Sequence, residues 1–354
     1  MNSIKLGRKI VDDNSLYFIA DIGANHDGSL EKAIRLIHLA KEAGADAAKF
    51  QNFSAKKIVS KIGFENMKGK LSHQSKWKKS VFEVYEDASI NKDWTAILKA
   101  ECDKAGIDYF TSPYDFESVD LVDPYVELYK IGSGDASWLE IIEYVLDKGK
   151  PTLLATGACD QVDVERMMEL ALSKTTDIVL MQCNTNYTGS PENFKYCNLN
   201  VLKDYKQKYP QTVLGLSDHT SGHATVLGSL ALGARVFEKH FTDDNNQEGP
   251  DHAFAMNPQT WRDMVDRSYE LLSAMGDGVK RVEDNEKQSY LVQRRCICAS
   301  KDLKAGHVIT EDDLTPLRPI GEDAFQPFEK SDLLGKTLLE DLEFGEHFKK
   351  SKVK

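Results

Sequence analysis

Short apolar runs alternate with amphipathic segments from residue 16 to residue 276. The apolar runs carry apolar side chains at consecutive positions, which is typical of strands that are buried on both faces. The segments between them repeat apolar residues every three or four positions, which predicts helices with one buried face. The predicted strands span residues 16–21, 46–51, 107–112, 126–132, 151–157, 177–183, 212–218 and 234–241. The predicted helices span residues 29–44, 91–106, 117–123, 137–149, 161–174, 199–209, 223–233 and 258–276.

Each of the predicted strands is followed by a predicted helix, and this regularity favours one architecture. Parallel strands that alternate with helices at this count are typical of a (β/α)8 barrel. A doubly wound open sheet is the alternative, but such sheets usually stop at five or six strands. We therefore predict an α/β fold with a TIM barrel. The connection at residues 52–90 is irregular, since it is long, Lys-rich and only weakly periodic.

The pattern changes near the C-terminus. Residues 294–320 alternate apolar and polar positions like short strands, and turn signals follow at Gly335 and Gly345. A β-rich segment of this size is near the lower limit for an independent core, so we expect it to pack against another part of the protein. We predict a barrel domain at residues 1–280, a linker at 281–293 and a small β-rich domain at 294–354.

Composition narrows the classes of function. The formal net charge is -11 and no Lys/Arg-rich run stands out, so we expect neither nucleic acid nor an anionic membrane as a partner. The N-terminus has no apolar signal-peptide core, and no apolar run reaches the length of a membrane span. The six cysteines form no CxxC pair, which indicates reduced thiols. We predict a cytoplasmic protein.

Two lysines interrupt otherwise apolar strands, where a cation without a partner is costly. Lys49 and Lys130 each come near the carboxyl end of a predicted strand, and their neighbours there are hydroxyls and amides, including Ser112 and Ser133. In a barrel, the functional side chains project from this end of the strands. We interpret the group as a clamp for a phosphate and a carboxylate. Structural ion pairing with barrel carboxylates is the alternative.

Two histidines end the last two predicted strands. His219 and His240 lie at corresponding positions, where two imidazoles can share a divalent cation and leave positions for water and substrate. His223 is a rival by spacing, but it belongs to the following helix. His26, after the first strand, is a further ligand or a substrate contact.

Carboxylates follow several of the same strands and are candidates for general acid and base chemistry. They are Asp21, Asp135, Asp218 and Asp251. Helix capping and ion pairing with the lysines are the alternative roles. Asp218 is suited to orienting the adjacent histidine.

The motifs at the strand ends resemble those of the sialic acid synthase family. These motifs are, in order, ADIGANHDG, AKFQ, YKIGSGD, ATG, GLSDHT, EKHF and GPDHAFAMNP. The C-terminal segment resembles the antifreeze-like (SAF, β-clip) domain of that family, so the resemblance covers nearly the whole chain. It implies an enzyme that condenses phosphoenolpyruvate with an N-acetylmannosamine-type sugar to a nine-carbon 2-keto acid. It also implies a divalent metal, Mn²⁺ or Mg²⁺, and a domain-swapped homodimer.

The resemblance also implies a role for each matching residue. The residues implied to bind phosphoenolpyruvate are Lys49, Ser112, Lys130, Ser133, Thr156 and Ser217. Gln51, Tyr187 and Asp251 match family positions near the sugar, and Arg318, from the small domain of the second subunit, is implied to contact it. Together with the carboxylates at the strand ends, we predict Asp21, Gln51, Asp135 and Asp251 to act in catalysis, and Asn25, His26, Tyr187 and Arg318 to bind the sugar. The metal ligands are implied to be His219 and His240.

Some positions depart from the family pattern. Asp21 and Asp135 stand where the family usually has glutamate, Ala155 stands where serine is common, and CNTNYTGSP replaces a C-T-x-x-Y-P run. Each change shortens or removes a polar side chain in the expected pocket. The acceptor therefore stays open between N-acetylmannosamine and the legionaminic or pseudaminic acid precursors.

Three other functions remain to be weighed. A phosphosugar aldolase on the same barrel would use a Schiff-base lysine, for which Lys130 is the candidate. A metal-dependent hydrolase would require His-x-His after the first strand, where only His26 is present. A binding protein built on the antifreeze-like module would not need polar residues at every strand end.

Overall fold

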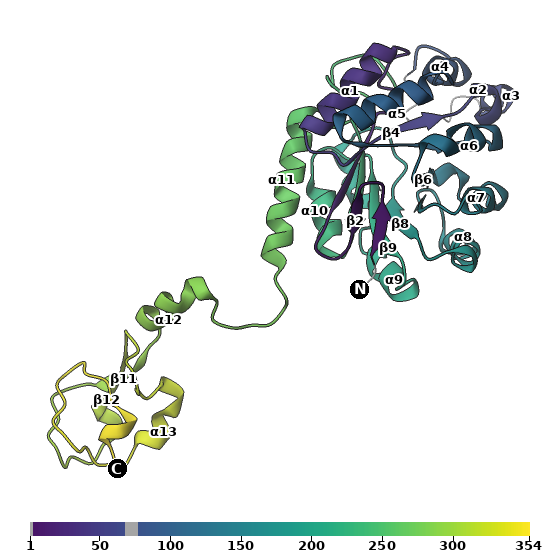
Figure 1. The fold of residues 1–354 in the computed structure, drawn as a ribbon. Helices are drawn as coiled ribbons and strands as arrows, with labels where there is room; N and C mark the ends of the chain where they lie inside the picture. Colours follow the sequence, from purple (N-terminus) through teal and green to yellow (C-terminus); the bar gives the residue numbers. More distant parts are fainter. Residues whose placement is uncertain (1–2, 68–76) are drawn as a thin grey trace. The chain divides into compact units, whose positions relative to one another are not determined.

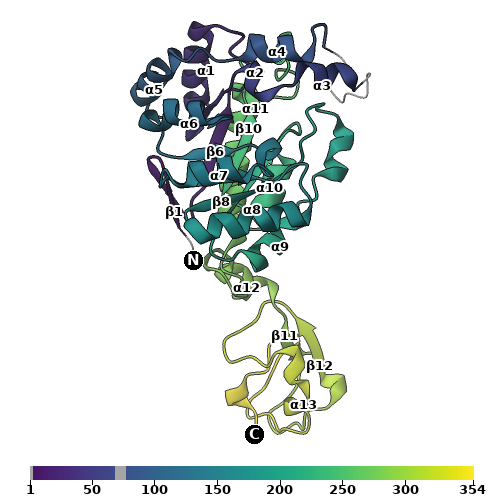
Figure 2. The same ribbon diagram turned by 90° about the vertical axis from the view of Figure 1, so that its right-hand side faces the viewer.

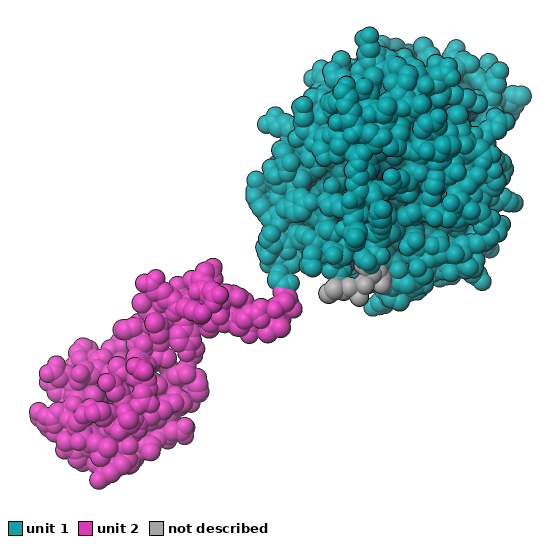
Figure 3. All heavy atoms as spheres, viewed as in Figure 1, with its two compact units in different colours: residues 1–276 teal, residues 277–354 magenta. Residues whose placement is uncertain are grey.

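The computed structural model describes residues 3–67 and 77–354 of the chain. It divides into two compact units, residues 1–276 and residues 277–354 (Figure 3). Each unit has its own apolar core.

The first unit is built on eight parallel strands. They are β3 (Tyr17–Asp21), β4 (Ala47–Asn52), β5 (Asp108–Pro113), β6 (Tyr129–Ile131), β7 (Thr152–Ala155), β8 (Ile178–Cys183), β9 (Val213–Asp218) and β10 (Val236–His240). Their order in the sheet is β5-β4-β3-β10-β9-β8-β7-β6, and the two end strands, β5 and β6, also lie next to each other. The sheet therefore curves into a near-closed barrel, which confirms the predicted fold class.

One helix of the outer layer follows each strand (Figure 1). These helices are α1 (Leu30–Glu42), α5 (Trp94–Ala105), α6 (Phe116–Val122), α7 (Leu139–Leu146), α8 (Gln161–Lys174), α9 (Val201–Lys208), α10 (Ala224–Ala231) and α11 (Pro258–Met275). Helices α7 and α8 pack side by side on the outside of the barrel (Figure 2). The strands are buried along their length except at Gln51 in β4, as apolar side chains at consecutive positions predict.

Two parts of the first unit differ from the prediction. The N-terminus forms an antiparallel hairpin of β1 (Ile4–Leu6) and β2 (Lys9–Val11), whose turn binds the Asp108 carboxylate at the amino end of β5 through the Arg8 N–H. The long connection after β4 contains α2 (Ala55–Ile58), α3 (Lys61–Asn66) and α4 (Val81–Ala88). Both parts consist of elements too short to show a clear period in the sequence.

The second unit is small and rich in turns. It contains α12 (Lys287–Gln293), β11 (Cys296–Ala299), β12 (Leu314–Leu317) and α13 (Lys330–Leu333). β11 and β12 pair antiparallel, and the core includes Ile297, Phe325 and Phe348. Helix α12 lies where we predicted a linker. In the described parts of the chain, no helix combines the length and the apolar composition needed to cross a membrane.

Candidate active site

A cavity of about 380 Å³ lies at the carboxyl ends of the strands. Parallel strands direct the side chains that follow them to this end of the barrel, which is the usual place of an active site in this fold. Twelve of the residues predicted from the sequence line it: Asp21, Lys49, Gln51, Ser112, Lys130, Ser133, Asp135, Tyr187, Ser217, His219, His240 and Asp251.

Two buried lysines form the floor of the cavity, and both pair with carboxylates. The Lys49 ammonium lies 2.6 Å from Asp21 and 3.8 Å from Glu238. Lys130 forms an ion pair with Glu238 and donates a hydrogen bond to the Ser217 hydroxyl at 3.0 Å. The pairing that we treated as the alternative is therefore present. The same lysines line the cavity, so a ligand can still contact them despite these ion pairs.

Three hydroxyls surround the lysines. The Ser133 oxygen accepts a hydrogen bond from the Gly157 N–H at 2.9 Å, and Ser217 donates to Glu238 at 3.1 Å. The Ser112 hydroxyl is buried and has no hydrogen-bond partner. Because buried polar groups are nearly always satisfied, an orphan hydroxyl at a cavity wall indicates a partner that a ligand supplies.

The two histidines face each other across one side of the cavity, with 5.4 Å between their ring centroids. Nδ1 of His219 donates to the Asn184 carbonyl at 2.9 Å, so its lone pair is on Nε2. Burial lowers the pKa of His219 to about 4, which keeps this imidazole neutral. Burial also lowers the pKa of His240, but Asp21 and Asp251 outweigh this and raise it above the ordinary value.

The carboxyl groups of the cavity differ in their charge. Burial by itself raises the pKa of Asp251. The charge of His240 and its hydrogen bond together have the larger effect and bring this pKa down to about 2. Burial likewise opposes ionisation of Asp21, and Lys49 and His240 still bring its pKa below the ordinary value. Burial alone raises the pKa of Asp135 to about 6. Asp135 is therefore the carboxyl group here that can both hold and release a proton near neutral pH.

Three predicted site residues of the first unit do not line the cavity. The Asn25 amide donates to the Phe241 carbonyl at 2.9 Å, and the His26 ring packs edge-on against Trp94. The Thr156 hydroxyl donates to the Met181 carbonyl and accepts from the Tyr205 hydroxyl, both at 3.0 Å. The Asn25 amide nitrogen and the Thr156 hydroxyl are thus used inside the protein, whereas Oδ1 of Asn25 is buried without a hydrogen-bond partner. Arg318 belongs to the second unit, residues 277–354.

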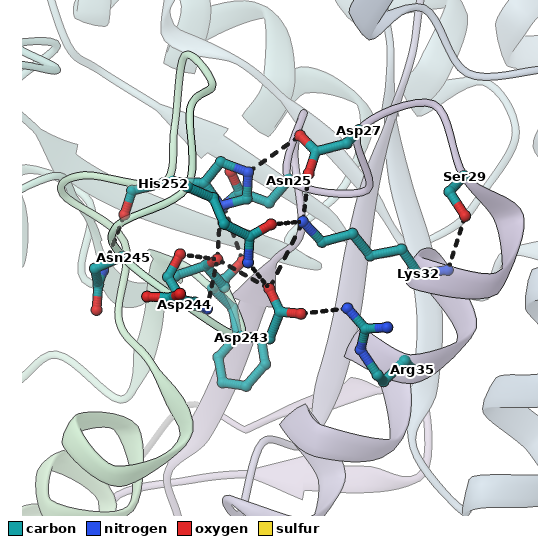
Figure 4. A network of polar contacts seen from close by, with 12 residues as sticks. Asn25, Asp27, Ser29, Lys32, Arg35, Asp243, Asp244, Asn245 and His252 are labelled. Carbon is teal, nitrogen blue, oxygen red and sulfur yellow. Dashed lines mark hydrogen bonds and ion pairs between the residues drawn. The ribbon is translucent and has the colours of Figure 1, made fainter.

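A separate polar network lies at the rim of the barrel and joins the loop after β3 to the loop after β10 (Figure 4). Lys32 forms ion pairs with Asp27 and Asp243 and a hydrogen bond to Gln247. The fully buried His252 ring contacts the Thr242 hydroxyl at 2.7 Å and Asp27 at 3.1 Å. We call Asp27, Lys32, Asp243, Gln247 and His252 the rim network. Its Asp27 lies three residues after Ala24, whose N–H donates to Asp251 at 3.1 Å.

The sequence reasoning missed several cavity residues. Glu238 is the most important, and its signal was present in the chain. It lies two residues before His240 in a buried strand, and side chains at this spacing face the same side. Most of the others come from the connection after β4 or directly follow β5: Phe53, Ile58, Trp77, Val84, Tyr85, Ala88 and Tyr114.

His219 and His240 are the residues of the cavity that could hold a metal ion. Among residues 3–67 and 77–354, no three His, Cys, Asp or Glu side chains gather closely enough to hold an ion by themselves. A neutral imidazole whose other nitrogen donates to a carbonyl is, however, the usual state of a metal-ligating histidine. His219 is in this state, whereas His240, whose pKa is raised, must give up a proton before it can bind a metal. With His240 deprotonated, the two imidazoles fit an ion that takes its remaining ligands from water and substrate.

Comparison with known proteins assigns the chain to a family. The NeuB family profile matches residues 36–280, and the SAF domain profile matches residues 294–354. The N,N'-diacetyllegionaminic acid synthase of Campylobacter jejuni is 32% identical over 85% of this chain and 90% of that protein. The pseudaminic acid synthase of Campylobacter jejuni is 32% identical over 96% and 97% of the two chains.

Similarity extends to a human protein and to solved structures. Human N-acetylneuraminate-9-phosphate synthase is 28% identical over 95% of this chain and 92% of its own. The structure of N-acetylneuraminic acid synthetase from Leptospira borgpetersenii in complex with citrate aligns with a TM-score of 0.70 at 26% identity, and covers 81% of this chain and 95% of that one. With one family profile spanning most of the barrel and a second the C-terminal unit, the chain belongs to the NeuB family.

Proposed function

We propose that this protein is a nonulosonic acid synthase, which joins phosphoenolpyruvate to the aldehyde of an N-acylated amino sugar and releases phosphate. The observation that carries the proposal is the cavity floor, where two buried lysines and an orphan serine hydroxyl lie opposite a pair of facing histidines. One half suits an anionic phosphate ester, and the other half suits a carbonyl oxygen. The names of the relatives support the same reaction class.

The charge balance of the cavity supports a requirement for an added cation. Lys49 and Lys130 share the cavity with Asp21, Asp135, Glu238 and Asp251. Phosphoenolpyruvate brings further negative charge into this low-dielectric site, where repulsion is strong. We therefore propose that Mn²⁺ or Mg²⁺ binds at His219 and His240. The chemistry that such an ion supplies there is Lewis-acid polarisation of the aldehyde carbonyl.

In the proposed reaction, C3 of phosphoenolpyruvate forms a bond to the aldehyde carbon of the sugar. The aldehyde oxygen takes up a proton and becomes a hydroxyl group. Water adds to C2 of the former enol, the C2–O bond to the phosphate breaks, and the 2-keto acid forms as the water oxygen loses its protons. Lys49, Lys130, Ser112 and Ser217 hold the phosphate and carboxylate, and this orientation of two reactants contributes much of the rate.

Proton transfer falls to the carboxyl groups at the cavity wall. Asp135, whose pKa is raised to about 6 by burial, is proposed as the proton donor and acceptor. Asp21 and Asp251 stay ionised beside His240 and orient it. The Gln51 amide donates a hydrogen bond to Asp21 at 3.1 Å, and we propose that it also contacts the sugar.

The aldolase alternative is not favoured. A Schiff-base lysine must present a free amine to its substrate. Lys130 instead forms an ion pair with Glu238 and a hydrogen bond to Ser217, so it is not placed as a free amine. Trapping with borohydride should therefore leave the protein unlabelled.

Further parts of the proposal concern the assembly. We propose a domain-swapped homodimer in the cytoplasm, in which Arg318 of one copy contacts the sugar bound by the other. The domain limits of 280 and 294 remain predictions. Arg318→Ala should raise the KM for the sugar about tenfold or more, the usual order for a lost charged contact, and leave the KM for phosphoenolpyruvate unchanged. Equal effects on both constants would argue against this contact.

The central experiment measures phosphate release from phosphoenolpyruvate with Mn²⁺, across N-acetylmannosamine, 2,4-diacetamido-2,4,6-trideoxyhexoses and simple aldoses, with mass detection of the product. Release that depends on one amino sugar and yields a nine-carbon keto acid establishes the reaction. Chelation should stop release, and His240→Ala should bind less Mn²⁺ by elemental analysis. If folded, metal-loaded protein releases no phosphate with any of the sugars, the proposal fails.

A further inference from the structure

The loop after β8 contains three polar side chains that bind one another. Asn193, in the 3₁₀ helix Pro191–Tyr196, is buried. Its amide donates to Oδ1 of Asn186 at 3.2 Å and to the Thr188 hydroxyl at 3.0 Å, and this hydroxyl donates to Oδ1 of Asn186 at 2.7 Å. Asn186 and Thr188 stand on either side of Tyr187 in the chain. We call Asn186, Thr188 and Asn193 the loop clamp.

The loop is attached to the barrel at both of its ends. At its start, the Asn184 carbonyl accepts a hydrogen bond from the His219 ring at 2.9 Å. At its end, the Cys197 carbonyl accepts one from the Gln182 side chain of β8 at 3.0 Å. The loop clamp lies between these two attachments. Because buried side-chain hydrogen bonds restrict the groups that they join, the loop clamp fixes the turn that carries Tyr187.

Tyr187 places its ring in the cavity, next to the histidines. Its ring centroid lies 4.2 Å from that of His219 and 5.8 Å from that of Phe254. Gly189 follows in the same turn with a φ of 64°, and a Cβ there would come within 3.0 Å of Cβ of Phe254. The backbone of the turn therefore lies directly against Phe254. The position of the Tyr187 ring thus depends on the conformation of this turn.

The sequence of this turn departs from the family pattern. CNTNYTGSP replaces the C-T-x-x-Y-P run, so Thr188 stands where that run has proline after the tyrosine. A proline ring restricts the backbone by fixing φ, which threonine does not do. In this chain, the side-chain hydrogen bonds of the loop clamp restrict the turn instead.

Resting on the proposed function, we propose that Asn193 is a positioning residue, which acts on the reaction by holding the Tyr187 ring against His219. This is the half of the cavity that suits the carbonyl oxygen of the acceptor sugar, since His219 and His240 face each other there. Without the loop clamp, the ring would have to be ordered again whenever the acceptor binds, which lowers affinity. Phosphoenolpyruvate is held by lysines of β4 and β6, so its binding should not depend on the loop clamp.

The first test is Asn193→Leu, which nearly preserves the volume of the side chain and removes both of its donated hydrogen bonds. Oδ1 of Asn186 keeps the N–H and the hydroxyl of Thr188 as donors, so no buried acceptor is left unpaired. The KM for the acceptor should rise about 3- to 10-fold, with a change of less than about twofold in the KM for phosphoenolpyruvate. Thr188→Val, which removes one bond of the same clamp, should change the acceptor KM in the same direction.

The possible results separate this inference from the proposed function. An unchanged acceptor KM in both variants, or an equal rise in both Michaelis constants, overturns the role of Asn193 and leaves the proposed reaction intact. Absence of turnover by the unmodified protein with every amino sugar is instead the failure of the proposed function.

A double-mutant cycle distinguishes positioning from a general effect on stability. Tyr187→Ala removes the ring that the loop clamp holds, so adding Asn193→Leu to it should leave kcat/KM for the acceptor within about twofold. The matched control is Asn257→Leu, because Asn257 caps α11 by accepting from the Thr260 N–H at 3.0 Å and is not among the cavity-lining residues. It should lower the temperature of thermal unfolding and keep the acceptor KM. A full further loss in the double variant, or the same rise in KM in the control, overturns the inference.

Discussion

Two polar clusters lie at the same end of the barrel, and they differ in how completely their hydrogen bonds are satisfied. In the rim network, Lys32 contacts Asp27, Asp243 and Gln247. In the cavity, the Ser112 hydroxyl and Oε2 of Glu238 are buried without a hydrogen-bond partner.

The difference separates structural from functional polar groups. A network that is satisfied internally stabilises the loops it joins. A cluster that keeps buried polar atoms unpaired costs stability, and it persists where a ligand supplies the missing partners. Charge alone does not distinguish the two, since both contain lysines and carboxylates. Substitutions should therefore separate them, with activity lost in the cavity and stability lost at the rim.

The largest effect is expected from Lys130→Met in the cavity. The change removes a cation that bonds to Ser217 and faces the proposed phosphate ester. The value of kcat/KM should fall by about 10³-fold or more, because an oriented charge in a closed site contributes strongly to transition-state binding. Initial rates of phosphate release with the best acceptor measure this change in kcat/KM.

The control for this substitution is the double variant Lys130→Met/Glu238→Gln. Removing the lysine alone leaves the Glu238 carboxylate with less compensation, which destabilises the fold, whereas removing both charges relieves this. Unfolding in urea should therefore show recovered stability in the double variant, with activity still lost. Recovered activity would contradict a role for Lys130 in binding.

At the rim, Lys32→Met should act on stability. Lys32 is buried, and its loss leaves Asp27 with one cationic partner fewer. We expect a decrease of about 2–3 kcal/mol in the free energy of unfolding and a change of less than about twofold in the KM for phosphoenolpyruvate. The matched control is Arg35→Met. The Arg35 side chain is 57% exposed in its pair with Asp243, so its loss should change the free energy of unfolding by less than about 1 kcal/mol. A large rise in KM with unchanged stability would reverse the assignment of the two clusters.

Much of the fold and the site followed from the sequence for a physical reason. Strands covered on both faces are apolar at consecutive positions, so any charge within them is conspicuous. Lys49 and Lys130 were predicted in this way. Their neighbours in the site were predicted because the functional side chains of a barrel follow the carboxyl ends of its strands. The N-terminal hairpin and α2 were not found, because three or four residues cannot display a period.

The errors within the site have a different cause. A position at the carboxyl end of a strand places a residue at the rim of the barrel. It does not say whether the side chain points into the cavity or toward the surrounding helices. Glu238 and His240 face the cavity, whereas Lys239 between them pairs with Asp218, as the two-residue period of a strand requires. Thr156 follows its strand too, yet it bonds to the Tyr205 hydroxyl of the surrounding helix layer. Whether a side chain points into the cavity can therefore be predicted within a strand, but not in the turn that follows it.

A smaller effect, dependent on pH, is expected at Asp135. Burial raises its pKa from the ordinary 3.8 to about 6, so folding binds its proton more tightly. The protonated group therefore favours the folded state below about pH 4, and this advantage is lost as the pH rises through 6. Asp135→Asn should unfold like the parent near pH 4 and be more stable by about 2 kcal/mol at pH 8. Urea unfolding at both values measures this, with the exposed Glu140→Gln as control; a difference that does not change with pH would contradict the raised pKa.

The smallest effect, and the most direct test of the comparison, is expected from Ser112→Ala. The hydroxyl has no partner within the protein, so its removal should leave the free energy of unfolding unchanged or raise it by up to about 1 kcal/mol. The KM for phosphoenolpyruvate should rise about tenfold, because the ligand loses the hydrogen bond that satisfied this group. The matched control is Ser118→Ala, since the buried Ser118 hydroxyl donates to Asp115 at 3.0 Å. That variant should lose about 1 kcal/mol of stability and keep its KM. If both serine variants lost stability and neither changed KM, an unpaired polar atom in this cavity would no longer indicate a ligand.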